Sequence, residues 1–196
     1  MIIMPANNTA GIVHYLAGAY PGSVGLMISP NGWRRPPFYM PYALDNGAFT
    51  GFDPVSFLGL LKNTLLISSK PLFVAVPDVV ADAEATLKLW REWNHKIPFK
   101  RAFVAQDGHE AVDVPYNADA VFVGGSTEWK LKSAHKFKGI TPWLHIGRVS
   151  TPSRLQWARD IGADSVDGTG FFRSDRRQLD LIEFITGVGQ MRFDGF

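Results

Sequence analysis

The sequence of 196 residues contains no cysteine. This absence excludes disulfide bonds, thiolate zinc sites and cysteine nucleophiles, and it is compatible with a reducing interior. No apolar run approaches the ~20 residues that a membrane-spanning helix needs, and the start of the chain does not resemble a signal peptide. We therefore expect a cytoplasmic protein with no membrane partner. No pair of histidines has the spacing of metal ligands, so no metal is expected. No other cofactor is expected either.

The positive and negative charges of the chain nearly balance. The formal net charge is +2, which is too small to indicate a nucleic-acid partner by itself. Hydrophobic residues make up 46% of the chain and aromatic residues 13%, which is enough for a substantial core, so the chain is not expected to be disordered. We find no linker, internal repeat or low-complexity tract. The chain, residues 1–196, is therefore interpreted as one domain, and its oligomeric state is left open.

Short apolar runs alternate along the chain with segments of helical periodicity. Parallel strands that are covered on both faces are apolar throughout, and eight runs fit that description. They span residues 1–4, 24–29, 42–45, 72–76, 102–105, 120–123, 143–146 and 164–167. Eight strands with intervening helices predict an α/β fold, a compact (β/α)8 TIM-type barrel, although about 250 residues are usual for this fold. An open doubly wound sheet is the alternative.

Two of the expected helices have clear start signals. Asp53-Pro54 and Thr151-Pro152 each place a capping residue before a first-turn proline. The stretch 107–119 is too short for a full helix and contains a glycine and a proline, so an irregular connection is expected there. The buried faces that the periodicity predicts are Val55, Leu58, Leu61 and Leu65; Val80, Ala83, Leu87 and Trp90; Leu155, Ala158 and Ile161; and Leu179, Ile182 and Ile185.

Three aspartates stand where apolar runs stop: Asp45, Asp78 and Asp167. In a barrel the reactive groups lie at the carboxyl ends of the strands, so these carboxylates are expected to form a catalytic rim, as in an enzyme. Asp78 and Gln106 together supply a donor, an acceptor and a carboxylate, the set needed to read the hydrogen-bonding edge of a purine. Glycines at the same ends let a flat ligand lie against the backbone.

Structural interpretations of the same residues remain open. An aspartate at a strand end is often only a helix cap or a turn former, and the three carboxylates favour a site only when they are taken together. Asp107-Gly108 is expected to be a turn. His145, on an apolar strand, is expected to be a core histidine with satisfied hydrogen bonds.

Six blocks of the sequence occur in the order of the motifs of one enzyme family. The blocks are LDNGAF (44–49), VPDVV (76–80), VAQDG (104–108), VGGS (123–126), HIGRVSTP (145–152) and VDGTGFFR (166–173). In these blocks the chain resembles the tRNA-guanine (queuine) transglycosylases. It resembles in particular their shortened members, often carried by phages, that act on DNA with 7-deazaguanine bases. For a phage-encoded member the compartment would be the host cytoplasm.

The resemblance implies roles for individual residues. Asp167 matches the nucleophile that attacks the sugar C1′, and Asp45 matches the proposed general acid/base. The family's tRNA enzymes also carry a structural zinc site of three cysteines and a histidine; without cysteine that subdomain is expected to be absent, which favours DNA over tRNA as the substrate. The residues that the resemblance assigns to substrate binding are Asn46, where the family usually has serine, Asp78, Gln106, Gly124, Gly125 and Arg173.

Base exchange fits the same carboxylates chemically. Retaining the sugar configuration requires two displacements, and so a covalent glycosyl intermediate on one carboxylate and a second carboxyl group that moves protons. The expected partners are a nucleic acid and a free 7-deazapurine base. Two alternatives remain open: a nucleic-acid glycosylase or nucleoside hydrolase that uses the same carboxylates, and a catalytically silent barrel that binds nucleic acid or a base.

Cationic residues gather near the predicted barrel mouth, where a phosphate backbone would need them, although a solvated helix face explains the lysines equally well. A base extruded from a duplex would also need an aromatic side chain to stack on it or to fill the gap; the candidates are Trp33, Phe49, Trp129, Phe171 and Phe172. The residues assigned to nucleic-acid binding are Arg34, Arg35, Lys130, Lys132, Lys136, Arg148, Arg176 and Arg177.

Overall fold

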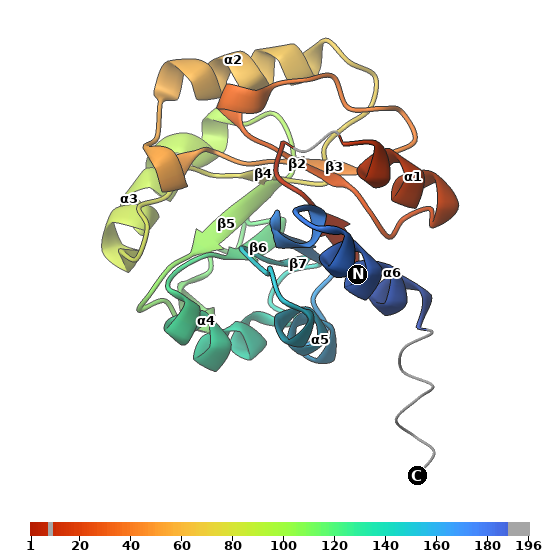
Figure 1. Ribbon diagram of the computed structural model, residues 1–196. Coiled ribbons are helices and arrows are strands. Elements are labelled where there is room, and N and C mark those ends of the chain that lie inside the picture. The colour runs from red at the N-terminus through yellow and green to blue at the C-terminus, as the bar shows by residue number, and fades with distance from the viewer. Residues whose placement is uncertain (8–9, 188–196) are drawn as a thin grey trace.

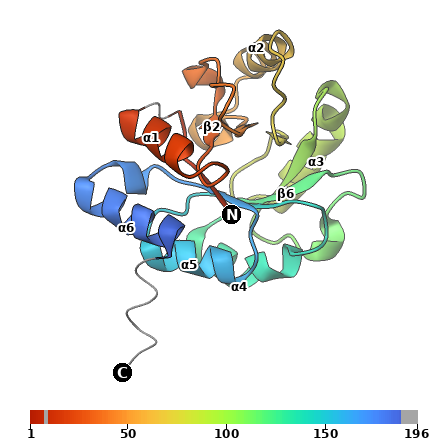
Figure 2. The ribbon, with the colours of Figure 1, turned by 90° about the vertical axis from the view of Figure 1, so that its right-hand side faces the viewer.

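The computed structural model describes residues 1–7 and 10–187, and within them eight parallel strands form one sheet. Six α-helices of the described chain surround these strands (Figures 1 and 2). All eight predicted strands are present, each within three residues of the expected range. The strands are β1 (Ile2–Met4), β2 (Leu26–Ile28), β3 (Tyr42–Leu44), β4 (Val74–Ala75), β5 (Arg101–Ala105), β6 (Ala120–Val123), β7 (Leu144–Ile146) and β8 (Ser165–Asp167).

The sheet curls into a nearly closed barrel. Its strand order is β1-β8-β7-β6-β5-β4-β3-β2, which leaves β1 and β2 at the two ends of the order. These two ends meet through the parallel bridges Ile3↔Val24 and Ala6↔Met27, and Gly25 N donates to Ile3 O at 3.0 Å. The predicted TIM-type barrel is therefore confirmed, and the doubly wound sheet is not observed.

Two of the strand connections lack an α-helix. The connection from β5 to β6 contains only the 3₁₀ turn Ala111–Asp113, as the sequence predicted. The connection from β2 to β3 contains only the 3₁₀ turn Pro30–Gly32, which was not expected. The absence of a helix from these two connections shortens the chain that the barrel needs. The helices are α1 (Gly11–Ala19), α2 (Pro54–Leu65), α3 (Ala83–Trp93), α4 (Thr127–Ser133), α5 (Pro152–Asp160) and α6 (Asp175–Thr186).

The helix starts are correct, but several predicted buried faces are wrong. Asp53 caps α2 by accepting a hydrogen bond from Val55 N, and Thr151 caps α5 in the same way. In α2 the prediction of Leu61 is right, whereas Val55, Leu58 and Leu65 are exposed and Phe57 and Leu60 are buried in their place. Val80 before α3 and Leu179 in α6 are also exposed. The face predicted for α5 is confirmed for Leu155 and Ala158.

A contact between neighbouring helices selects the buried face of α2. Phe57 lies edge-on against Trp93 at the end of α3, with ring centroids 5.9 Å apart, and Phe52 packs against both rings. Such aromatic pairs stabilise the packing beyond their buried area. The segment is apolar on more than one side, so its own periodicity did not identify the side that faces the barrel.

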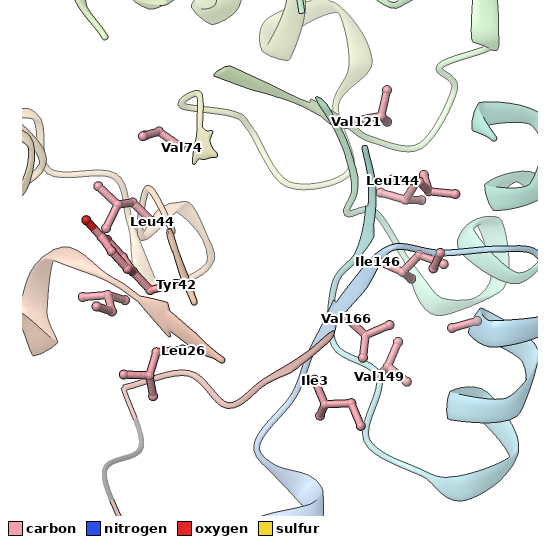
Figure 3. Close-up of a cluster of buried hydrophobic side chains, with 14 of the residues drawn as sticks. Ile3, Leu26, Tyr42, Leu44, Val74, Val121, Leu144, Ile146, Val149 and Val166 are labelled. Atoms are coloured by element: carbon pink, nitrogen blue, oxygen red, sulfur yellow. The ribbon is translucent and has the colours of Figure 1, made fainter. Parts of the chain in front are cut away.

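The apolar core has two parts that follow the alternation of side chains along each strand. Outward-facing residues meet the helices: Figure 3 shows Leu144, Ile146 and Val166 directed away from the ring of strands toward the surrounding helices. Inward-facing residues fill the barrel, so the inside is packed rather than hollow. The inner set is Met4, Met27, Ala43, Phe73, Ala102 and Ala120. No helix in the described part of the chain is long and apolar enough to cross a membrane.

Candidate active site

A cavity of about 340 Å³ opens at the carboxyl ends of the strands. Its volume is at the lower end of the range for small-molecule sites. The expected convergence of carboxylates and amides on one barrel mouth is observed, since the residues named from the sequence come together here from six different strand ends. Those that line the cavity are Asp45, Asn46, Asp78, Gln106, Gly124, Gly125, Arg148 and Asp167.

Asp45 follows β3 and holds its proton unusually well. Its backbone N–H donates to Ile28 O at 2.8 Å, which continues the pairing with β2 and sets the side chain over the barrel. Burial first, and then the neighbouring carboxylates of Asp167 and Asp78, raise the pKa of Asp45 to about 7, against hydrogen bonds from the backbone of Gly47 and Asn46. A carboxyl group with this pKa can both give and take a proton near neutral pH.

Asp78 is the centre of a buried amide and carboxylate network. Asn46 Nδ2 donates to Asp78 Oδ1 at 2.7 Å, and Gln106 Nε2 donates to Asp78 Oδ2 at 2.6 Å. Burial raises the pKa of Asp78 and outweighs the lowering by these two hydrogen bonds and the Arg148 cation, which leaves the pKa at about 6. Each carboxylate oxygen keeps a second lone pair, so Asp78 can still accept a hydrogen bond from a ligand.

The orientation of the Gln106 amide is fixed by the backbone around it. Gln106 Oε1 accepts hydrogen bonds from Ala81 N at 2.9 Å and from Gly125 N at 2.8 Å. Both lone pairs of this oxygen are thus used, so Nε2 must lie on the Asp78 side with one N–H to spare. A Cβ atom at Gly124 would lie 2.6 Å from Gln106 Nε2, so the glycine leaves the room that this amide occupies.

Asp167 is the last residue of β8, and its hydrogen bonds all involve one of its two carboxylate oxygens. Its Oδ1 accepts a hydrogen bond from Arg148 N at 3.0 Å and lies 3.2 Å from His145 Nε2. Arg148 adopts a left-handed conformation with φ of 57°, which turns its N–H toward the carboxylate. Among the residues that the structure describes, Oδ2 has no hydrogen-bond partner.

His145 is a neighbour of Asp167 that the sequence analysis did not connect with the site. It is fully buried and packs against the rings of Phe73 and Phe122, with centroids 5.2 and 4.5 Å away, and both ring nitrogens have partners. The prediction of a satisfied core histidine is therefore correct, but one of its partners is Asp167. The alternation of side chains along the strands could have predicted this contact, because residues 145, 165 and 167 lie at inward positions of two adjacent strands.

Lys130 corrects the predicted phosphate contacts. It is 5% exposed, and its Nζ donates to Gly147 O inside the protein, so it cannot line a surface track. The reason is that the first turn of α4 lies directly against the β7 end, where the Gly147 carbonyl offers an acceptor. Lys132 Nζ and Lys136 Nζ lie at the surface but pair with Glu128 and Glu110, at 2.7 and 2.9 Å.

The remaining predicted cations lie at or near the surface. Arg148 reaches over the cavity, with Nη2 donating to Gly125 O and its guanidinium 5.0 Å from the centre of the Phe49 ring. Arg173 is exposed and donates to Thr169 Oγ1, so the structure does not bring it into the cavity as the substrate-binding prediction required. The other four arginines of the prediction are also exposed: Arg34, Arg35, Arg176 and Arg177, the last of which donates to Gly170 O.

Phe49 is distinguished from the other candidate aromatic side chains by its position. It is 68% exposed and lines the cavity, whereas the other four are buried or half-buried in the core: Trp33, Trp129, Phe171 and Phe172. The expected turn at Asp107-Gly108 is confirmed, and Asp107 accepts hydrogen bonds from Ser126 N and Oγ at 2.5 and 2.6 Å.

Comparison with known proteins adds no name to this site. No protein-family model matches the chain, and no curated protein matches it. In the described residues, no group of three or more histidines and carboxylates could hold a metal ion. Any functional assignment therefore depends on the geometry of the cavity.

Proposed function

We propose that the protein is a pentosyltransferase that exchanges a purine base in a nucleic acid, DNA more readily than tRNA, through a covalent ester on Asp167. The incoming base would be a 7-deazaguanine and the outgoing base guanine, as for the transglycosylases that its sequence blocks resemble. The observation that carries the proposal is the pair Asp45 and Asp167 in one cavity. One carboxyl keeps a proton near neutral pH, and the other has an oxygen with no partner in the described chain.

The chemistry balances with these two groups alone. Asp167 Oδ2 attacks the sugar C1′ while the bond from C1′ to the base nitrogen breaks, and protonated Asp45 gives its proton to the departing base. The Asp45 carboxylate then takes the N–H proton of the incoming base. The freed nitrogen attacks C1′ and releases Asp167. Two displacements at one carbon return the original sugar configuration.

The Asp78 and Gln106 pair supports a guanine-type edge. Because the Gln106 amide cannot flip, it offers a donor, and Asp78 beside it offers acceptor lone pairs. Guanine presents the complementary order, with the O6 acceptor next to the N1 and N2 donors. Adenine carries a donor where guanine carries O6, so adenine would leave the Gln106 N–H unpaired, which costs about 1–3 kcal/mol in a buried site.

Phe49 and the exposed arginines support a nucleic-acid substrate. A planar ring at the cavity mouth, with a guanidinium 5.0 Å from its centre, can stack on an extruded base. Arg35 and Arg176 are exposed, where they can meet phosphates.

The test is base exchange with a defined oligonucleotide. Duplex and single-stranded DNA, and a tRNA, all carrying labelled guanine, are incubated with the protein with and without a free 7-deazaguanine. We expect label release that requires the deazapurine, and a protein adduct visible by intact mass. Asp167→Asn should abolish both, because an amide cannot form the ester. Asp45→Asn should slow exchange by about 10²–10⁴.

Two outcomes would contradict the proposal. Label release without a second base, leaving abasic sites, would indicate a hydrolase. Retention of nucleic acid with no release would indicate a binding module. Asp180→Asn, in α6 and outside the cavity lining, is the matched control and should react like the wild type.

A further inference from the structure

A line of four side chains runs through the barrel interior from its packed end to Asp167. Trp143 Nε1 lies 2.8 Å from Ser165 Oγ, Ser165 Oγ lies 2.8 Å from His145 Nδ1, and His145 Nε2 lies 3.2 Å from Asp167 Oδ1. Trp143 precedes β7 and packs against the inner core cluster, so the line begins at the end of the barrel opposite the cavity. Nothing in the base-exchange steps above uses the first three of these groups.

The direction of the hydrogen bonds follows from the chemistry of the two ends. The indole N–H of Trp143 can only donate, so Ser165 Oγ accepts from it and can give its own hydroxyl hydrogen to His145 Nδ1. At the other end, the carboxylate of Asp167 can only accept, so His145 Nε2 must carry a proton. One neutral tautomer, with hydrogen on Nε2, satisfies both ends of the line.

The surroundings of His145 keep this tautomer in place. Burial lowers the pKa of His145, although the adjacent Asp167 raises it. The charged groups near the ring are Asp167 on β8 and Lys130 on α4, and the rings of Phe73 and Phe122 pack against it. The ring is fully buried and both of its nitrogens have hydrogen-bond partners, so the donor is held in place.

We propose that His145 is a positioning residue for the nucleophile: its Nε2–H, oriented by Ser165 and Trp143, holds Asp167 Oδ1 so that Oδ2 faces the sugar. This inference rests on the proposed function only for the role of Asp167. Arg148 N holds the same oxygen from the mouth side, so Oδ1 is fixed between two donors from β7 and the residues that follow it. A carboxylate free to rotate about its χ angles would spend much of its time turned away from C1′.

The first measurement is the ring-nitrogen NMR spectrum of the ¹⁵N-histidine protein, with His145→Gln for assignment. We expect a protonated Nε2 and an unprotonated Nδ1 for His145 at neutral pH. A proton on Nδ1, or a doubly protonated ring, would overturn the proposal. This result does not depend on any activity.

The second measurement compares adduct formation by His145→Phe and His145→Gln with that of the wild type. Phenylalanine keeps the ring packing but removes the donor, and we expect a loss of about 10²-fold in kcat with little change in KM. Glutamine can donate from Nε2 and should recover much of the rate, at a similar or lower melting temperature. The control is His95→Gln, because His95 is exposed and does not line the cavity.

Rates that track the melting temperatures of the variants, rather than the presence of a donor, would overturn the proposal. So would a wild-type rate for His145→Phe while Asp167→Asn is inactive. If the wild type itself forms no adduct with any substrate, the proposed function fails, and the spectrum alone decides whether His145 orients Asp167.

Discussion

At the scale of single residues, the cavity concentrates carboxyl groups that resist ionisation. Asp45 and Asp78 have raised pKa values for the same first cause, removal from water, and Asp45 also faces the charges of the other two aspartates. Ionising such a group in place costs folding free energy, because the unfolded chain would hold the same charge in water. The site therefore makes the folded state less stable at neutral pH than it is in mild acid.

Removing the Asp45 charge should reverse part of that cost. The folded protein keeps the Asp45 proton up to about pH 7, whereas the unfolded chain loses it near the ordinary pKa of 3.8. The free energy of unfolding therefore falls as the pH rises between these values and levels off above them. Asp45→Asn should be more stable than the wild type at pH 8 by a few kcal/mol, since a difference of one in pKa corresponds to about 1.4 kcal/mol.

Melting temperatures at pH 5 and pH 8 check this expectation. The advantage of Asp45→Asn should shrink toward pH 5, where the wild-type carboxyl is protonated. Asp180→Asn should show no comparable change between the two values. An equal effect of Asp45→Asn at both values would mean that the carboxyl is not held protonated by the fold.

At the scale of elements, α4 does not present a row of cations to a ligand. Lys130 is directed inward to the Gly147 carbonyl and so supports the left-handed turn at Arg148, which in turn donates to Asp167. Lys132 lies one turn from Glu128 on the same helix, and the two form an ion pair at 2.7 Å. The helix supports the loop that holds the Asp167 carboxylate.

Nucleic-acid affinity should therefore depend on arginines outside α4. The double change Arg35→Gln and Arg176→Gln should flatten the log–log salt dependence of duplex binding by about 1.8, because each lost phosphate contact removes about 0.9. Lys130→Met should leave that slope unchanged while lowering the rate of base exchange. Binding titrations at four salt concentrations measure both slopes. A slope that falls with Lys130→Met and not with the arginine pair would contradict this division of roles.

The sequence predicted elements well where burial is simple. Doubly covered parallel strands are apolar throughout, so all eight were found, and the aspartates that follow them were placed at the correct end of the barrel. The face of α2 was wrong because Val55 and Leu58 are as apolar as Leu60 and Leu61, and only the rings of Phe52 and Trp93 decide between them.

Contacts that join distant strands were harder to predict. The burial of Lys130 depends on a carbonyl seventeen residues away, and the link from His145 to Asp167 depends on the register of β7 against β8, His145↔Ser165. The sequence around Lys130 and around His145 does not show which distant residue each side chain contacts. An inward position on a strand next to a catalytic candidate is the pattern that would have identified His145.

At the scale of the whole molecule, the barrel closes where β1, β2 and β3 meet. Gly25 stands in this seam, and a Cβ atom there would lie 2.6 Å from Pro41 O and 3.2 Å from Ile2 Cγ2. The neighbours are backbone and packed side chains of two other strands, so they cannot yield without opening the seam.

Gly25→Ala should destabilise the protein by about 1–3 kcal/mol, as overpacking in a closed core does. Gly18→Ala is the matched change: that glycine lies in α1 with no atom within 4 Å of an added Cβ, and the helix should gain or keep stability. Chemical denaturation of both variants measures the difference. Equal stabilities would show that the seam is loose enough to accept a side chain.

The pairing of β1 with β8 has a consequence for the order in which the site comes into existence. Met4 lies opposite Asp167 in the register of these strands, so β1 has no partner on that side until the ribosome has made and released residue 167. A nascent chain carries Asp45, Asp78 and Gln106 before it carries Asp167. The cavity with all three carboxylates can therefore form only after residue 167 has been made.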